Sequence, residues 1–288
     1  MTSYNIEEKS IPEKTNNSFP LPIMSVLIGF VGGIVGGFLG GGGGVVTVPA
    51  LDRVTSWPRV RIHGTSTLVN IVIAVVGASI YSLHGGAVDL RTGIGLMCGG
   101  LVGAPLGARL ASYVPERFLR LLFICVLVLS GLKLLLGGAQ PDNQATIAWL
   151  PAQKTPLALL MLLTFLLGIL IGAWSSSMGL GGGLLAVPAL VLIFGVSQHA
   201  AEGTSLLIMI PNTIVGSIAH LRQHTASLRL GSVMSIGALG GAALGTFVAF
   251  LLSNQVLQLI FGCFVLIMAL REGYAFSRWM HTAKNISQ

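Results

Sequence analysis

Two glycine runs, 139 residues apart, are the positions in this chain best suited to chemistry. The first run ends at Gly44 and precedes Val-Val-Thr-Val-Pro49, and the second ends at Gly183 and precedes Leu-Leu-Ala-Val-Pro188. Consecutive glycines interrupt a helix and expose backbone N–H groups. Because the positive end of the next helix points at the same place, each run can hold a compact anion. The predicted anion-binding glycines are Gly41, Gly42, Gly43, Gly44, Gly181, Gly182 and Gly183.

Uncharged polar side chains near the runs are further candidates for substrate binding. Asn70 lies near the middle of an apolar stretch, and Asn212 lies about one turn from the matching position in the second half. Either amide can contact a substrate or make an interhelical hydrogen bond. Ser176 and Ser177 precede the second run and can donate to an anion or bond back to helix carbonyls. The glycines themselves have an alternative role in close helix packing.

A titratable residue precedes each copy of a repeated Gly-Thr-Ser motif. His63 precedes the first copy and Glu202 the second, so both are candidates for proton coupling, although an interfacial solvated charge is the alternative for each. Prolines inside the first turns of the following helices remove an N–H at little cost. Residues expected to cap, pack or shape the site are Pro49, Thr65, Ser66, Pro188, Thr204 and Ser205.

Composition places the chain in a membrane. Of its 288 residues 53% are hydrophobic and only 9% are charged, against roughly 25% charged in soluble domains. The net charge of +7 is attributed to loops that face anionic lipid and the cytoplasm, not to nucleic-acid binding. Cys98, Cys125 and Cys263 lie in apolar stretches without metal-ligand spacing, so no disulfide, metal or other cofactor is expected.

The predicted fold is an all-α polytopic membrane protein made of two homologous repeats. Glycines four residues apart, at 95, 99, 103 and 107 and at 237, 241 and 245, predict close helix packing. The predicted units are an N-terminal polar tail (1–21), a first repeat (22–136), a linker (137–155), a second repeat (156–276) and a C-terminal tail (277–288). Apolar stretches predict spans at 22–39, 62–83, 92–112, 118–136, 157–177, 203–221, 230–252 and 256–274, with half-helices at 44–51 and 183–194.

The distribution of Lys and Arg favours inverted repeats. If each half crosses the membrane four times, ten of the sixteen basic residues face the cytoplasm and six face outward. If the first span and its half-helix form a re-entrant hairpin, three full spans remain per half. The second half is then inverted, and the count becomes thirteen against three. The positive-inside rule favours this second arrangement.

The doubled glycine–proline motif, the Gly-Thr-Ser that follows it and the small-residue spans resemble the TauE/SafE family of sulfite exporters. The resemblance covers residues 22–275. It implies an integral membrane protein of the bacterial plasma membrane that moves sulfite, sulfonates such as sulfoacetate, or other sulfur-containing anions. The two halves differ at Gly41 against Leu180 and at Gly36-Gly37-Phe38 against Ser175-Ser176-Ser177, so the half-sites are expected to be unequal.

The predicted function is secondary transport of a small anion by alternating access, with the anion bound at paired half-helix N-termini. A passive anion channel, a membrane scaffold and an intramembrane enzyme are the alternatives. Against an enzyme, the sequence has no HExxH motif and no paired intramembrane aspartates. The expected partners are the anion, membrane lipid and protons, with a second copy of the chain as a further candidate.

Overall fold

The computed structural model describes residues 22–83, 88–110, 116–137, 149–178 and 182–286. These residues form helices joined by short loops, without strands in the described ranges. Each predicted span and half-helix corresponds to a helix of the structure. The helices are α1 (Pro22–Leu39), α2 (Gly44–Val54), α3 (Arg59–Leu83), α4 (Leu90–Leu110), α5 (Glu116–Gly137), α6 (Leu157–Met178), α7 (Gly183–Leu192), α8 (Gln198–Arg222), α9 (Leu228–Leu251) and α10 (Asn254–Ile286).

Five helices are long and apolar enough to cross a membrane: α1, α3, α8, α9 and the Asn254–Arg278 part of α10. Among the described residues, α4, α5 and α6 contribute shorter apolar stretches. Large apolar side chains such as Ile236 and Leu270 are 70% and 74% exposed on the outside of the bundle. Such exposure is unfavourable in water but suits lipid, so the chain is a multi-pass membrane protein.

Two helix pairs pack most closely, and both cross between the halves of the sequence. Helix α1 packs along α9, and α6 packs along α4. A Cβ added at Gly99 would collide with the α6 backbone at Phe165, and one added at Gly241 would collide with the α1 backbone at Phe30. The predicted packing role is confirmed for the glycines at 95, 99, 103, 237, 241 and 245, because a side chain at any of them would collide with the facing helix. The surroundings of Gly107 lie outside the described positions.

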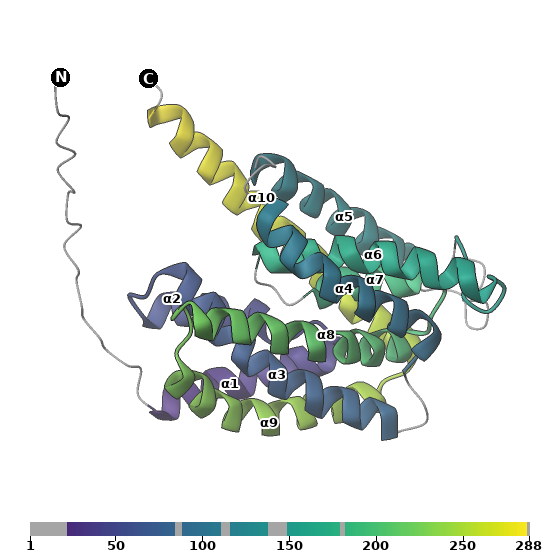
Figure 1. Cartoon of the computed structure of the whole chain (residues 1–288), viewed down its shortest axis with the longest axis horizontal. Coiled ribbons are helices and arrows are strands. Elements are labelled where there is room, and N and C mark those ends of the chain that lie inside the picture. Colours follow the sequence, from purple (N-terminus) through teal and green to yellow (C-terminus); the bar gives the residue numbers. More distant parts are fainter. Residues whose placement is uncertain (1–21, 84–87, 111–115, 138–148, 179–181, 287–288) are drawn as a thin grey trace.

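The contacts fix the relative directions of the helices. Along α1 and α9 the contact positions rise together, from Gly29 beside Met234 to Gly37 beside Ala242, so these helices are parallel. The same reasoning makes α3 parallel to α9, and α4 parallel to both α6 and α8. Helices α3 and α8 are antiparallel, because their contacts run in opposite order. Thus α1, α3 and α9 run one way, and α4, α6 and α8 run the other (Figure 1).

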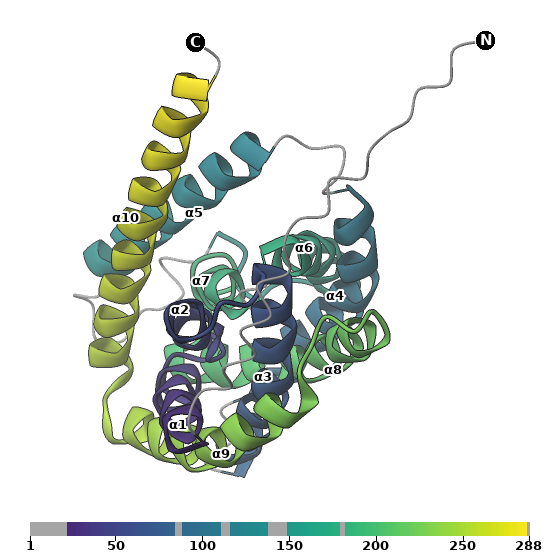
Figure 2. The same ribbon diagram turned by 90° about the vertical axis from the view of Figure 1, so that its left-hand side faces the viewer.

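The two short helices lie in the interior of the arrangement. Viewed end-on, α2 and α7 lie between the α5–α10 pair and the α3 and α8 helices (Figure 2). Helix α2 runs back along α1, since Gly36 lies beside Gly43 and Gly32 lies beside Thr47. As α3 then runs in the direction of α1, the chain enters α3 from the end of the bundle at which α1 began.

The ends of the chain differ in what the structure describes. The predicted N-terminal tail, 1–21, lies outside the described residues. Helix α10 continues to Ile286, so most of the predicted C-terminal tail, 277–288, is a helical extension of the last span. In Figure 1 this extension projects beyond the other helices.

Candidate functional site

The two glycine runs meet inside the bundle. A Cβ added at Gly183 would lie 2.5 Å from the Cα of Gly41 and 2.6 Å from the carbonyl oxygen of Gly40. Gly40, Gly42 and Gly182 have φ values of +62°, +77° and +75°, which side-chain-bearing residues rarely adopt. Helices α2 and α7 therefore both begin next to this contact, although their first residues are 139 positions apart in the sequence.

The N-terminus of α2 is tied to α3 by two side chains. The backbone N–H of Gly43 donates to Asn70 Oδ1 at 2.9 Å, and Asn70 is buried. One turn further on, the hydroxyls of Thr47 and Ser66 share a hydrogen bond of 2.6 Å. Asn70 thus reaches the predicted site, where its amide oxygen occupies the acceptor position that an anion would take.

The N-terminus of α7 lacks both of these ties. Counting 139 residues on from Asn70 and Thr47 reaches Met209 and Ala186, which offer neither an amide nor a hydroxyl. Among the described residues, no side chain accepts from the N–H groups at the start of α7. The hydroxyl of Ser205, which matches Ser66, is fully buried without a hydrogen-bond partner.

Several predicted site residues lie elsewhere or outside the described part. Asn212 packs against Gly100 of α4, and its buried Oδ1 has no hydrogen-bond partner. Gly181 and the side chains of Ser176 and Ser177 fall outside the described positions. Pro49 and Pro188 occupy the sixth helical position of α2 and α7, one turn further in than predicted. Both half-helices begin where predicted, at Gly44 and Gly183, but the sixth position from such a start belongs to the second turn and not to the first.

Glu202 lies directly against the first glycine run. A Cβ added at Gly40 would lie 2.6 Å from the Cα of Glu202. Its carboxylate is fully buried, accepting from Tyr81 Oη at 2.7 Å and from Gln198 Nε2 at 2.8 Å. No basic side chain of the described residues pairs with it. The solvated interfacial role considered for Glu202 is therefore wrong, because tertiary packing closes this end of α8 against α3 and the break.

His63 occupies the opposite end of the α3–α8 pair. It is partly buried, lies near Arg59 and His220, and its Nδ1 has no hydrogen-bond partner. The helix directions place it far along α3 from Tyr81, so the two predicted coupling residues do not form one cluster.

The threonines of the Gly-Thr-Ser motifs hold helix starts in the opposite half of the chain. Thr65 Oγ1 accepts from the N–H of Ser227 at 3.0 Å, just before α9. Thr204 Oγ1 accepts from the N–H of Asp89 at 2.8 Å, just before α4. These contacts agree with the structural role expected of the motifs, but the sequence did not indicate which helix each threonine would hold.

Sequence reasoning missed three side chains at the break: Tyr81, Gln198 and Met209. The Met209 methyl lies against Gly42, and the other two residues bind Glu202. A tyrosine and a glutamine in apolar sequence are a usable signal, because a buried polar group needs a partner. The spacing of one helical turn before Glu202 was a signal that could have identified Gln198, whereas no such signal existed for Tyr81.

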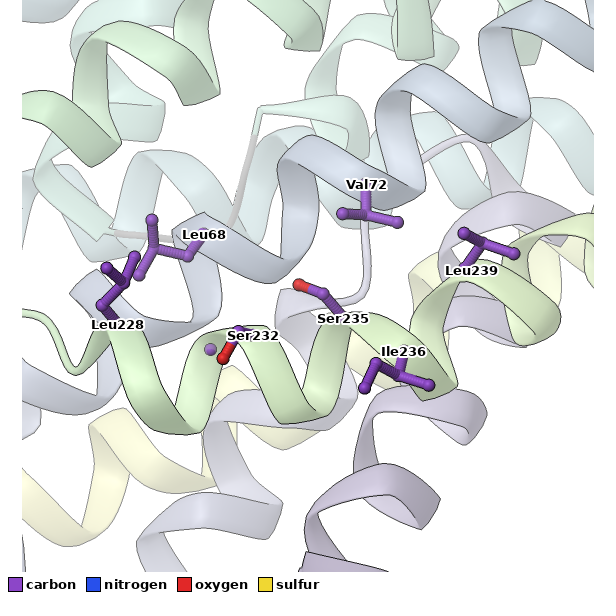
Figure 3. A pocket seen from close by; sticks show the side chains of 8 residues that line it. Leu68, Val72, Leu228, Ser232, Ser235, Ile236 and Leu239 are labelled. Atoms are coloured by element: carbon purple, nitrogen blue, oxygen red, sulfur yellow. The ribbon is translucent and has the colours of Figure 1, made fainter.

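A shallow groove on the outside of the bundle is separate from this site (Figure 3). It is lined by Leu68 and Val72 of α3 and by α9 residues that include Ser232, Ser235 and Ile236. Leu68 and Val72 lie on the face of α3 opposite Asn70, and Ile236 is exposed. The groove thus faces the lipid and not the glycine breaks.

Comparison with known proteins agrees with this architecture. The sulfite exporter TauE/SafE family model matches residues 4–134 and 163–286. A probable membrane transporter protein of Xylella fastidiosa (strain 9a5c) is 29% identical over 244 residues, which cover 83% of this chain and 91% of that protein. The probable membrane transporter protein YunE of Bacillus subtilis (strain 168) is 27% identical over 238 residues, covering 77% and 86%.

No solved structure matches the chain. The family match nevertheless spans nearly all of both halves, including the two glycine breaks and the Gly-Thr-Ser motifs, and the family consists of membrane transporters and not of enzymes. The chain therefore belongs to the sulfite exporter TauE/SafE family.

Proposed function

We propose that the chain is a secondary carrier of a small sulfur-containing anion, such as sulfite or a sulfonate like sulfoacetate. The observation that carries this proposal is the contact between the two glycine breaks at Gly40, Gly41 and Gly183. Two helix N-termini and several N–H groups converge there inside the bundle, where a compact oxyanion can be bound without a buried arginine.

The proposal includes two inverted repeats that exchange conformations. Under the 139-residue relation α1 and α3 correspond to α6 and α8, and under an offset of 138 residues α4 corresponds to α9. Each corresponding pair runs in opposite directions. The packing of α1 on α9 and of α6 on α4 supports the same two-fold relation. So do the two threonine contacts, of Thr65 with Ser227 and of Thr204 with Asp89.

In this arrangement each first helix and its half-helix form a re-entrant hairpin. Support comes from α2, which runs back along α1, and from α3, which begins at the end where α1 began. The loop with Arg53 and Arg59 then lies at the same end as Arg222, whereas Lys154 lies at the other end. The positive-inside rule assigns the first end to the cytoplasm.

Transport is proposed to be coupled to protons through Glu202, with His63 as the second candidate. Glu202 is buried beside the break, so its protonation changes the charge next to the bound anion. We also propose that the carrier lies in the bacterial plasma membrane, where its partners are lipid and, as a candidate, a second copy of the chain.

The function is tested by uptake into proteoliposomes that contain the purified full chain. Sulfite, thiosulfate, sulfoacetate, taurine and sulfate are each offered with and without an imposed proton gradient. Saturable, gradient-driven uptake of a sulfur-containing anion is the expected result. Uptake that ignores the gradient and does not saturate would favour the channel alternative, and no uptake of any of the five would contradict the proposal.

A further inference from the structure

The two half-helix N-termini differ in whether a side chain of the protein accepts a hydrogen bond from their backbone N–H groups. Asn70 Oδ1 accepts from Gly43 N–H at α2, and the Thr47–Ser66 hydrogen bond fastens the same half-helix to α3. At α7 the corresponding residues are Met209 and Ala186. The second half has therefore lost both polar ties while keeping the serine of the hydroxyl pair.

That serine, Ser205, is one of two described serines of α8, with Ser217, whose buried hydroxyls have no hydrogen-bond partner, and it is the one on the helix face that contacts the glycine break. Its side chain is 0% exposed and its hydroxyl has no hydrogen-bond partner. The hydroxyls of Thr65, Thr164 and Thr213 bond back to a carbonyl four residues earlier, but that of Ser205 does not. A buried hydroxyl without a partner is destabilising, so its presence needs a reason other than packing.

The position of Ser205 directs it toward the meeting of the breaks. On α8 it lies between Glu202, which contacts Gly40, and Met209, which contacts Gly42. These three residues follow a spacing of three and four, so they share one face of the helix. The matching Ser66 bonds from α3 to the half-helix α2, and α8 likewise packs against the half-helix α7.

There is also room beside the α7 N-terminus. Among the described residues, a Cβ added at Gly41 would meet nothing closer than 3.9 Å, and one of the two atoms at that distance is the backbone nitrogen of Leu184. This is an ordinary van der Waals distance, so an atom of the size of a methyl group fits between Gly41 and the first turn of α7 without displacing either backbone. An atom in this space can accept from the α7 N–H groups.

From these observations we infer that Ser205 is a substrate-binding residue and that the anion binds at the α7 N-terminus, while Asn70 occupies the α2 N-terminus. The inference rests on the proposed function and refines it. The oxyanion accepts from the Ser205 hydroxyl and from the first N–H groups of α7. The binding site is therefore asymmetric within a two-fold scaffold, and Ser205 takes part in binding instead of the structural role expected from the sequence.

The test compares Ser205→Ala with the matched control Ser66→Ala in the full chain. Two quantities are measured for each protein. The first is the apparent KM for uptake, and the second is the midpoint of thermal unfolding, without anion and with sulfite, thiosulfate or sulfoacetate added singly. Losing a hydrogen bond to a charged ligand raises the apparent KM of Ser205→Ala about tenfold or more. Its midpoint without anion stays at or above that of the wild type, because an unpartnered hydroxyl has been removed.

Ser66→Ala is expected to behave in the opposite way. It leaves Thr47 without its partner, so its midpoint falls, while its apparent KM stays within about twofold of the wild type. A third variant, Ala186→Ser, supplies Ser205 with the partner that Thr47 gives to Ser66, and it is expected to raise the apparent KM several-fold without lowering the midpoint.

Two results would overturn the inference while the proposed function stands. One is a wild-type apparent KM in both Ser205→Ala and Ala186→Ser, and the other is a fall in the Ser205→Ala midpoint as large as that of Ser66→Ala. If the wild type neither takes up nor is stabilised by any of the three anions, the proposed function itself fails, and the inference fails with it.

Discussion

At the scale of single residues, the contact between the breaks depends on the absence of side chains. The Cα of Gly183 packs against backbone atoms of Gly40 and Gly41. Backbone atoms cannot move aside as the end of a flexible side chain can. A single methyl group at this point separates the two half-helix N-termini. The glycine content of the runs is thus a condition for their contact and not only a source of chain flexibility.

We therefore expect Gly183→Ala to reduce uptake to below about a tenth of the wild-type rate, because overpacking at a backbone contact costs about 1–3 kcal/mol and displaces α7. Gly216→Ala is the matched control, since its Cβ would meet only Thr67 Cγ2 at 3.5 Å. That variant should keep wild-type uptake and gain up to about 1 kcal/mol in helix stability. Equal uptake by the two variants would contradict a functional contact.

Glu202 is the second residue whose role depends on its surroundings. Its carboxylate is buried with Tyr81 and Gln198 as the donors, so a neutral amide fits the site with little change in volume. Glu202→Gln should keep anion-induced stabilisation but flatten the pH dependence of the uptake rate, because the group that can gain and lose a proton is gone. His63→Gln is the comparison. If both variants retain the wild-type pH profile, the coupling group lies elsewhere.

At the scale of elements, glycine spacing sets the packing of the long helices. The α1–α9 and α4–α6 pairs approach until backbone oxygens lie where side chains would otherwise project. In lipid, where burial of apolar surface gives little driving force between helices, such backbone proximity is a major source of association. The half-helices α2 and α7 are held inside the frame that these pairs build.

Neighbouring glycines of α9 provide a direct test of this packing. A Cβ at Gly241 would collide with the carbonyl oxygen of Phe30, whereas a Cβ at Gly240 would touch the Phe30 ring at 3.7 Å, an ordinary contact. Gly241→Ala should lower the thermal midpoint, with a cost of about 1–3 kcal/mol. Gly240→Ala should leave it unchanged or raise it slightly. A reversed order would contradict the packing of α1 on α9.

At the scale of the whole molecule, the direction of each helix determines which loops share a side of the membrane. Ser56 and Gln153 are both exposed, just before α3 and α6. Since α3 and α6 run in opposite directions, their starts lie at opposite ends of the bundle. Under the proposed topology Ser56 is cytoplasmic and Gln153 is external.

Single cysteines at these two positions, in a background without Cys98, Cys125 and Cys263, test the proposal. In intact cells a membrane-impermeant thiol reagent should label the Gln153→Cys variant, and the Ser56→Cys variant only after the membrane is opened. Labelling of both from the same side would contradict inverted repeats and would favour four crossings in each half.

The sequence by itself determined the membrane environment, the helices and the family resemblance. Low charge and long apolar stretches specify helices in lipid, because unpaired backbone groups are not tolerated there. The glycine runs were recognisable as helix breaks from the sequence because the φ preference of glycine is a property of the residue itself. These features depend on composition and short-range spacing, so one sequence sufficed to predict them.

Only the tertiary structure decided which groups meet. Asn70 accepts a hydrogen bond at the α2 N-terminus, whereas the amide of Asn212 lies against Gly100 of α4. Tyr81 and Glu202 are 121 residues apart and become partners only when α3 and α8 pack antiparallel. Likewise the serines of the two identical Gly-Thr-Ser motifs differ in their hydrogen bonding. Ser66 bonds to Thr47, whereas Ser205 has no such partner because Ala186 stands at the position that corresponds to Thr47. Local sequence specifies each element, whereas the partner of a buried polar group is fixed by which helix is packed against it.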